Sequence, residues 1–318
     1  MQKIYLPIIC CCLYVTLQAQ QEPQYTQFMF NKLAFNPAYA GSFESPTIMA
    51  IYRSQWMGLE GAPETQIISY NQRAARNRVG IGGHLARNTI GITRTLTFNI
   101  DYAYRVPLRR GYLSAGVQPS IRHLYQDWTD PRLNASQKFD GAIPTEPKSK
   151  IVANVGFGVF YTGYKWYAGA AAPRLINNSI DFADYGGNLS REVLHLNAMG
   201  GLTFDVAEEL VITPQVLLKY VANSPFDADI NISALFRNKF YGGLTYRTGG
   251  DTNGTGESVD ALAGIQATEN LFFCLSYDIG LTRLRKYNNG SVEAMVRWWF
   301  NPPAPDDTEK VDPGRPWQ

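Results

Sequence analysis

The sequence predicts an all-β protein, a transmembrane antiparallel β-barrel of about 14 strands, with an N-terminal non-strand segment that plugs or caps the barrel. Three observations predict this fold. Apolar and polar residues alternate with period two from residue 46 onward, as in a strand with two unlike faces. The strand candidates are about 10 to 16 residues long, enough to cross a bilayer when tilted. Short and long connections largely alternate between them, as in outer-membrane barrels.

The composition is typical of a chain with much surface facing something other than water. Of the 318 residues, 13% are aromatic and 18% are charged, whereas about a quarter are charged in soluble domains. The net charge is +2, and the basic residues are scattered along the chain instead of forming a cluster. We therefore expect outer-membrane lipid as a partner, and no nucleic acid.

Residues 1–19 are predicted to be a signal peptide. A basic residue precedes an apolar run from Ile4 to Leu17, and the small residue Ala19 precedes the expected cleavage point. The run is too short for a membrane-spanning helix. Three of the four cysteines lie inside this peptide, which leaves Cys274 alone in the mature chain. We therefore expect no intramolecular disulfide, no metal site and no cofactor.

Residues 20–45 form an aromatic segment without a period-two face. A disordered linker would contain fewer aromatic residues. We expect the segment either to fold into the barrel mouth or lumen as a plug, or to cover the periplasmic opening as a cap. The stretch from Asn36 to Gly41 is rich in turn-forming residues and would lead the chain into the barrel wall.

Residues 46–300 form the predicted barrel wall. Large apolar side chains such as Ile100 and Phe273 would face lipid, and the polar residues between them would face the interior. The expected strands cover residues 46–57, 64–73, 78–87, 92–107, 111–125, 149–162, 164–176, 191–206, 209–222, 226–237, 239–248, 257–268, 270–284 and 291–300. Four aromatic residues at strand ends are expected at the membrane interfaces, namely Trp166, Tyr167, Trp298 and Trp299.

The connections between these strands predict the orientation. The even-numbered connections are tight and polar, whereas several odd-numbered ones are long, notably residues 126–148 and 177–190. Short periplasmic turns and longer outer loops are typical of outer-membrane barrels. One odd connection, near residues 88–91, is short. We expect an integral protein of the cell outer membrane with both termini periplasmic, and a flexible periplasmic tail over the Pro-rich residues 301–318.

A soluble β-sandwich or a lipocalin-like barrel is the alternative fold, with the same apolar faces turned inward. The number and length of the strands argue against it. A core filled by fourteen faces rich in Tyr and Phe would also be unusually large.

The sequence has no arrangement of residues typical of an enzyme. His84, His123 and His195 lie on different predicted strands and do not form a metal-binding pair. The stretch that begins at Asp227 is similar to a calcium-binding loop, but Ile232 replaces the glycine that such a loop requires. A Ser/His site built across strands, as in an outer-membrane lipid enzyme, stays open. No nucleophile-elbow pattern supports it, so we expect a protein that is not an enzyme.

Short motifs near the N-terminus resemble the opening of a known family. Residues 24–31 read QYTQFMFN, residues 36–41 NPAYAG, residues 53–58 RSQWMG and residues 61–65 GAPET. They resemble the PorP/SprF family, membrane proteins of the Bacteroidota type IX secretion system, although Lys32 stands where a proline is expected. The resemblance implies a non-enzymatic outer-membrane component that assists export or surface attachment of cargo proteins with C-terminal sorting domains. The implied partners are the type IX translocon, the periplasmic ring and motor proteins, and the cargo.

The residues of these motifs are our candidates for partner binding or for plugging the barrel. They are Tyr25, Gln27, Phe28, Phe30, Asn31, Asn36, Pro37, Tyr39, Gly41, Arg53, Gln55, Trp56, Gly58 and Pro63. A passive outer-membrane channel or porin for small solutes is the alternative function, because polar rows facing the interior would suit an open pore.

Overall fold

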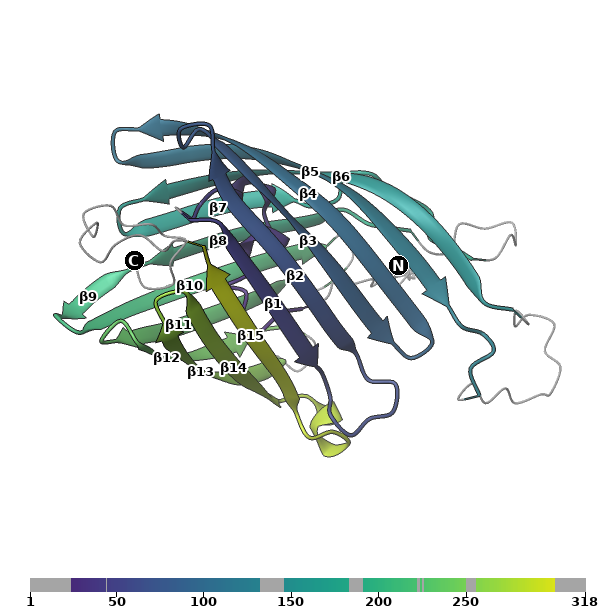
Figure 1. Cartoon of the computed structure of the whole chain (residues 1–318). Coiled ribbons are helices and arrows are strands. Elements are labelled where there is room, and N and C mark those ends of the chain that lie inside the picture. The colour runs from purple at the N-terminus through teal and green to yellow at the C-terminus, as the bar shows by residue number, and fades with distance from the viewer. Residues whose placement is uncertain are drawn as a thin grey trace, which may run out of the picture.

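The computed structural model describes residues 24–43, 45–131, 146–182, 191–221, 224, 226–249 and 256–300. They form an antiparallel β-barrel with three short 3-10 helices (Figure 1). The strands are β1 (Thr47–Ser54), β2 (Glu64–Ala74), β3 (Val79–Ile90), β4 (Thr93–Leu108), β5 (Gly111–Gln126), β6 (Lys148–Gly163), β7 (Trp166–Ala172), β8 (His195–Leu202), β9 (Phe204–Ala207), β10 (Leu210–Val221), β11 (Asp227–Phe236), β12 (Phe240–Arg247), β13 (Ser258–Thr268), β14 (Leu271–Gly280) and β15 (Ser291–Trp299). The helices are η1 (Lys32–Ala34), η2 (Pro37–Tyr39) and η3 (Arg283–Lys286).

The strands close into a barrel, because the two ends of the strand order are joined by pairing. β1 pairs with β2 on one side and with β15 on the other, and β10 pairs with β11. β8 and β9 are separated only by Thr203 and both pair with β10, so they form one interrupted wall strand. The wall therefore has the predicted 14 strands, with the interruption accounting for the fifteenth.

The largest difference from the expected strand limits is at β7. This strand was expected over residues 164–176 but ends at Ala172. Pro173 follows, and a proline has no N–H to donate to the ladder. Beyond it, Oδ1 of Asn154 on β6 accepts from the backbone N–H groups of Leu175 and Ile176, both at 3.0 Å, and the N–H of Leu175 also donates to the carbonyl of Val155 at 3.0 Å.

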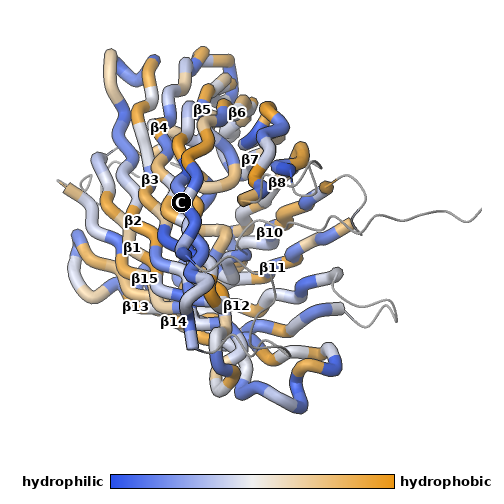
Figure 2. Tube along the Cα trace, turned by 90° about the vertical axis from the view of Figure 1, so that its right-hand side faces the viewer, coloured by the Kyte–Doolittle hydropathy of each residue, from blue (hydrophilic) through white to orange (hydrophobic). Residues whose placement is uncertain are grey.

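The two faces of the wall follow the predicted alternation, which is visible along the strands in Figure 2. Ile100 and Phe273 are 48% and 42% exposed on the outer face, whereas their neighbours Asp101 and Cys274 are buried on the inner face. Large apolar side chains thus cover the outside, where lipid would lie, and polar ones point inward.

The expectation for the strand-end aromatics is wrong in part. Trp166 and Trp298 are exposed on the outer face, but Tyr167 and Trp299 are buried inside the barrel. Consecutive residues of a strand point to opposite faces, so adjacent aromatics cannot all lie at the lipid surface.

The connections divide the barrel into two unlike ends. The short-turn mouth carries residues 75–78, 109–110, 164–165, 208–209, 237–239 and 269–270. The long-loop mouth carries the described residues 55–63, 91–92, 127–131, 146–147, 173–182, 191–194, 224, 226, 248–249, 256–257 and 281–290. β1 begins and β15 ends at the short-turn mouth, where the N–H of Phe300 donates to the carbonyl of Pro46 at 2.9 Å.

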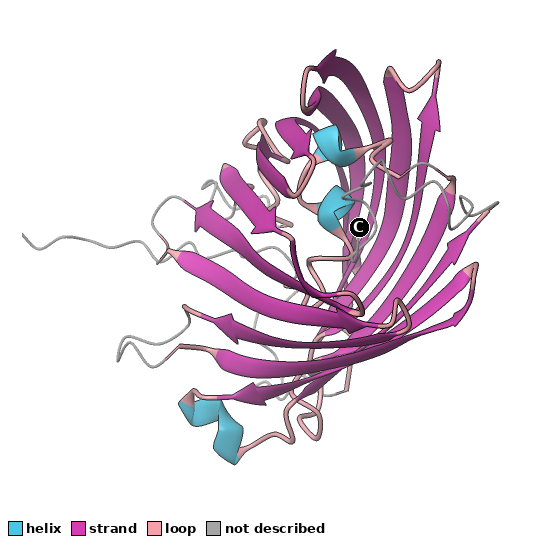
Figure 3. Cartoon of the chain, turned by 90° about the vertical axis from the view of Figure 1, so that its left-hand side faces the viewer, coloured by secondary structure: helices cyan, strands magenta, loops and turns pink. Residues whose placement is uncertain are grey.

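Residues 24–43, termed here the N-terminal segment, lie inside the barrel. Figure 3 shows η1 and η2 enclosed by the curved wall, with η3 outside it. All residues of the segment except Gln24 and Ala34 are buried. No helix in the described part of the chain is long and apolar enough to cross a membrane. The predicted signal peptide, residues 1–19, and the predicted tail, residues 301–318, lie outside the described residues.

Candidate functional site

The N-terminal segment runs along the lumen from one mouth to the other. At its start, Nε2 of Gln24 donates to Asp227 at 3.2 Å, and Asp227 begins β11 at the long-loop mouth. At its end, the N–H of Gly41 donates to Oδ1 of Asn71 at 2.6 Å, close to the short-turn end of β2. The segment therefore enters β1 after passing the length of the barrel.

Near the long-loop mouth the segment is held by a carboxylate clasp, formed by Thr26, Gln27, Arg53, Asp278 and Glu293. The two oxygens of Glu293 accept from the backbone N–H groups of Thr26 and Gln27, each at 2.9 Å. The hydroxyl of Thr26 lies 2.8 Å from both oxygens of Asp278 and accepts from Arg53 at 2.6 Å. Arg53 also pairs with Asp278 at 2.7 Å and with Glu293 at 3.2 Å.

The clasp is built from buried charges, so each one depends on its partners. Arg53 and Glu293 are 1% and 0% exposed, and a buried charge is costly unless it is paired and hydrogen-bonded. The two backbone N–H groups of the segment supply bonds that the wall does not provide to Glu293. Docking of the segment and burial of these charges therefore support each other.

A second group of charges lies beside the clasp on the neighbouring strands. Arg247 pairs with Asp229 at 2.8 Å and lies 3.8 Å from Asp260. Lys219 pairs with Asp227 at 2.9 Å and with Asp229 at 3.0 Å. Arg247 also donates to the carbonyl of Tyr25 in the segment, at 3.4 Å. The lumen near the long-loop mouth is thus lined by charges of both signs, which lie on the neighbouring strands from β10 through β15 to β1.

In its middle the segment packs through aromatic rings. The ring of Phe30 lies 5.0 Å from that of Tyr241 and 5.3 Å from that of Phe272. The guanidinium of Arg297 lies over Phe30 and Phe43, at 5.2 and 5.0 Å from their centroids, and donates to the Phe30 carbonyl at 2.7 Å. Such cation–π contacts are strongest when, as here, the cation is removed from water.

At the short-turn mouth the backbone of the segment touches the wall directly. Arg73 donates to the carbonyls of Gly41 and Ser42, at 3.0 and 2.9 Å, and Arg105 donates to Gly41 as well. An added Cβ on Gly80 would lie 2.0 Å from the carbonyl oxygen of Ala40. Gly41 itself has φ +72°, a conformation that glycine adopts without strain.

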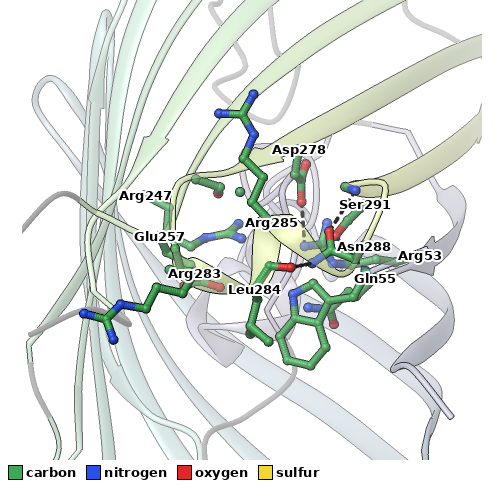
Figure 4. Close-up of a pocket in the computed structure, with 15 residues that line it drawn as sticks. Arg53, Gln55, Arg247, Glu257, Asp278, Arg283, Leu284, Arg285, Asn288 and Ser291 are labelled. Atoms are coloured by element: carbon green, nitrogen blue, oxygen red, sulfur yellow. Dashed lines mark hydrogen bonds and ion pairs between the residues drawn. The ribbon is translucent and has the colours of Figure 1, made fainter. Parts of the chain in front are cut away.

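A cavity of about 390 Å³ opens above the clasp at the long-loop mouth (Figure 4). Its lining includes Arg53, Trp56, Arg247, Glu257 and Asp278, together with residues of η3 and the β14–β15 loop. Burial raises the pKa of the Glu257 carboxyl, and the guanidinium of Arg247 partly opposes that rise. The floor of the cavity carries charged side chains that are held in ion pairs, such as Arg53 with Asp278. Its rim is formed by loops.

The loop that follows β1 is held in a defined shape at this cavity. Trp56 has φ 47°, which is unusual for a bulky residue. Strained backbone conformations of this kind persist where surrounding contacts hold them, and they cluster at functional sites. The N–H of Met57 donates to Gly290, and the N–H of Asn289 donates to Met57, both at 2.8 Å. The loop between β1 and β2 is therefore joined to the loop between β14 and β15.

The structure separates the predicted site residues into two groups. Arg53, Gln55 and Trp56 line the mouth cavity, and Gly58 lies against Asn289 beside it. Pro63 accepts a backbone bond from Gln55 at 2.9 Å. The second group is buried inside the barrel as part of the segment and comprises Tyr25, Gln27, Phe28, Phe30, Asn31, Asn36, Pro37, Tyr39 and Gly41.

The two groups meet at the clasp, where Gln27 and Arg53 both bind Glu293. Sequence reasoning missed the wall residues that hold the segment. The main ones are Asn71, Arg105, Arg247, Asp278, Glu293 and Arg297. Charged residues on the inner face of an apolar strand, such as Glu293 and Arg297 on β15, were the available signal.

The described residues contain no group of three or more His, Cys, Asp or Glu side chains placed to hold a metal ion. The buried His84 contacts Asn99 and lies 3.8 Å from Asp101. The imidazole of His195 lies 2.8 Å from the carbonyl of Val193.

Comparison with known proteins identifies a family and a fold. The family model described as type IX secretion system membrane protein PorP/SprF matches residues 17–298. Among solved structures, the chain is similar to the TodX deltaS2S3 mutant monoaromatic hydrocarbon channel, at 11% identity and a TM-score of 0.51, covering 85% of this chain and 94% of that one. It is also similar to the Acinetobacter baumannii outer membrane protein Omp33, at 6% identity and a TM-score of 0.49, covering 82% and 100%.

No sequence among the curated proteins matches the chain. The likeness to TodX is at low identity and concerns the barrel fold alone. The family model, by contrast, spans most of the chain. The protein therefore belongs to the PorP/SprF family of type IX secretion system membrane proteins.

Proposed function

We propose that this protein is a non-enzymatic component of the type IX secretion system that assists export or surface attachment of cargo proteins with C-terminal sorting domains. In this proposal the long-loop mouth, with its cavity at Arg53 and Trp56, receives cargo. The short-turn mouth contacts the periplasmic ring and motor proteins.

One observation carries the choice of a docking barrel over an open pore. The N-terminal segment occupies the lumen and is bound along its length by buried charges and aromatic rings. Two cavities that border it hold only about 40 and 10 Å³, and the smaller has room for about one water molecule. A solute pore would need a continuous water-filled path past these contacts.

The cavity at the long-loop mouth supports a binding role there. Its loops are held in one arrangement by backbone bonds, so a partner would meet a preformed surface. Its lining combines an indole and an aliphatic side chain, Trp56 and Leu284, with charged groups, which suits a polypeptide with both apolar and polar side chains.

A cargo assay tests the proposal. In a strain that lacks the gene, we expect surface attachment of a sorting-domain cargo to be lost and to be restored by the wild-type protein. Trp56→Ala, in the cavity, should restore it poorly. Trp166→Ala, on the outer face at the opposite end of the barrel, should restore it fully. Equal restoration by both variants would argue against the cavity as the cargo site.

A passive channel is the second candidate, because the inner face is polar and the fold is like that of a hydrocarbon channel. Conductance across planar bilayers separates the two functions. Large, stable, ohmic openings of the wild-type protein would favour the channel. Crosslinking in outer membranes followed by affinity purification should recover translocon or motor subunits if the secretion role is correct.

A further inference from the structure

We propose that the mature amino terminus emerges at the long-loop mouth, on the side of the membrane opposite to the end of the barrel wall. The inference rests on the path of the N-terminal segment and does not depend on the type IX role. It differs from the expectation that both termini are periplasmic, which was drawn from the even strand number and the alternation of short and long connections.

The first described residues lie at the long-loop mouth by several independent contacts. Gln24 binds Asp227 at the beginning of β11, and the carbonyl of Tyr25 binds Arg247 at the end of β12. Both strands reach the long-loop mouth at these residues. The hydroxyl of Thr26 binds Asp278, two residues before the end of β14 at the same mouth.

The end of the barrel wall lies at the other mouth. β15 ends at Trp299, and the next residue, Phe300, is bonded to Pro46 just before β1. The chain thus crosses the membrane thickness once more than the strand count implies, because residues 24–43 cross inside the lumen. An even number of wall strands would place both termini together only if the segment stayed at the short-turn mouth.

The few residues that precede Gln24 are too short to return across the barrel. Cleavage after Ala19 would leave residues 20–23, which reach at most about 14 Å when extended. An eight-residue strand such as β1, tilted as in outer-membrane barrels, rises roughly 20 Å along the barrel axis. The direct path back is also filled by the segment, whose side chains are buried against the wall.

This path places the two ends of the segment at opposite mouths of the barrel. Its C-terminal end continues into β1 at the short-turn mouth, whereas the clasp and the adjacent charges hold its N-terminal end. Cleavage after Ala19 would place the mature chain end beside the mouth cavity, where a partner at the long-loop mouth can bind it. A partner at the short-turn mouth meets only the continuous chain.

Cysteine labelling in cells tests the inference. Single cysteines are placed at Gln21→Cys, at Lys286→Cys as a marker of the long-loop mouth, and at Glu208→Cys as a marker of the short-turn mouth, all in a Cys274→Ala background. Lys286 and Glu208 are exposed, and heat-modifiable migration in electrophoresis verifies that each barrel is folded. A membrane-impermeant maleimide is applied to intact cells and to cells with a permeabilised outer membrane.

We expect position 21 to be labelled or protected together with position 286, and in intact cells to give the opposite result to position 208. This comparison of position 21 with the two marker positions is valid whichever mouth faces outward. If position 21 behaves like position 208 in intact cells, or labels only after the barrel is unfolded, the inference is overturned. An epitope inserted after Gln20, probed by antibody in the same two cell preparations, must give the same side.

Discussion

Arg53 and Glu293 lie directly opposite each other on the first and last strands of the barrel, with their charged atoms 3.2 Å apart. This ion pair sits on the seam where β1 and β15 close the wall. Glu293 also binds the backbone of Thr26 and Gln27. Closure of the barrel and docking of the N-terminal segment therefore use the same carboxylate, although its contacts are far apart in the sequence.

Removing the cation of the seam should destabilise the barrel strongly. In Arg53→Met the carboxylates of Asp278 and Glu293 lose their shared partner, and breaking a buried pair in this way costs about 3 to 5 kcal/mol. We expect the temperature at which the folded band disappears in electrophoresis to fall. Arg283→Met removes an exposed arginine of η3 and is the matched control. An equal fall in both variants would contradict the role of the seam.

The outer face should not tolerate charge. Ile100→Arg and Phe273→Arg place a cation where the structure exposes large apolar side chains. We expect each to cost roughly 2 to 4 kcal/mol if the site is near the bilayer midplane. Reduced assembly into outer membranes is the readout. Glu208→Arg, in an exposed short turn, should assemble normally, and comparable loss in all three variants would show that the apolar face does not contact lipid.

A single methyl group at Gly80 should displace the segment from the wall. The added Cβ would lie 2.0 Å from the Ala40 carbonyl oxygen, well inside contact distance, and overpacking of this kind costs about 1 to 3 kcal/mol. Gly242→Ala is the control, because an added Cβ there meets no described atom within 4 Å. The temperature at which the folded band disappears in electrophoresis should fall for Gly80→Ala and not for Gly242→Ala. Identical melting of the two variants would mean that Ala40 does not pack on β3.

The side chain of Asn36 should help to hold the segment in the lumen. Its Oδ1 accepts from the N–H of Ala38 at 2.9 Å, and its Nδ2 donates to the carbonyl of Val159 at 3.0 Å. Loss of a cap and a buried hydrogen bond costs about 1 to 2 kcal/mol. We expect Asn36→Ala to increase tryptic cleavage after the buried Lys32, measured by mass spectrometry. Asn289→Ala, at an exposed loop, should leave that rate unchanged.

The sequence predicted the wall well because strand signals are local. The alternation from Leu96 to Val106 requires only that neighbouring side chains point to opposite faces, and no distant contact is needed to read it. Prediction failed where one residue overrides the pattern. Pro173 ends β7 early by lacking a donor, and Tyr167 and Trp299 point inward because their neighbours already occupy the outer face.

The motifs near the N-terminus were recognisable, but their contacts were not. Residues such as Asn36 and Gly41 lie in no regular strand, so nothing in their spacing indicates which wall residues they meet. The partners are set by the strand register, which brings Asn71 to Gly41 and Glu293 to Thr26. Similarly, the inward charges on β15 were visible as polar positions, but their pairing required the closed barrel.

By itself, the sequence determined a barrel of 14 wall strands with apolar residues outside and polar residues inside, since alternation depends on backbone geometry alone. The tertiary structure decided that residues 24–43 pass through the lumen and that Arg53, on β1, meets Glu293, on β15. Those features arise only when the first and last strands pair, because closure brings distant charges into a space that excludes water. There each charge must find a partner, and the N-terminal segment supplies part of that pairing.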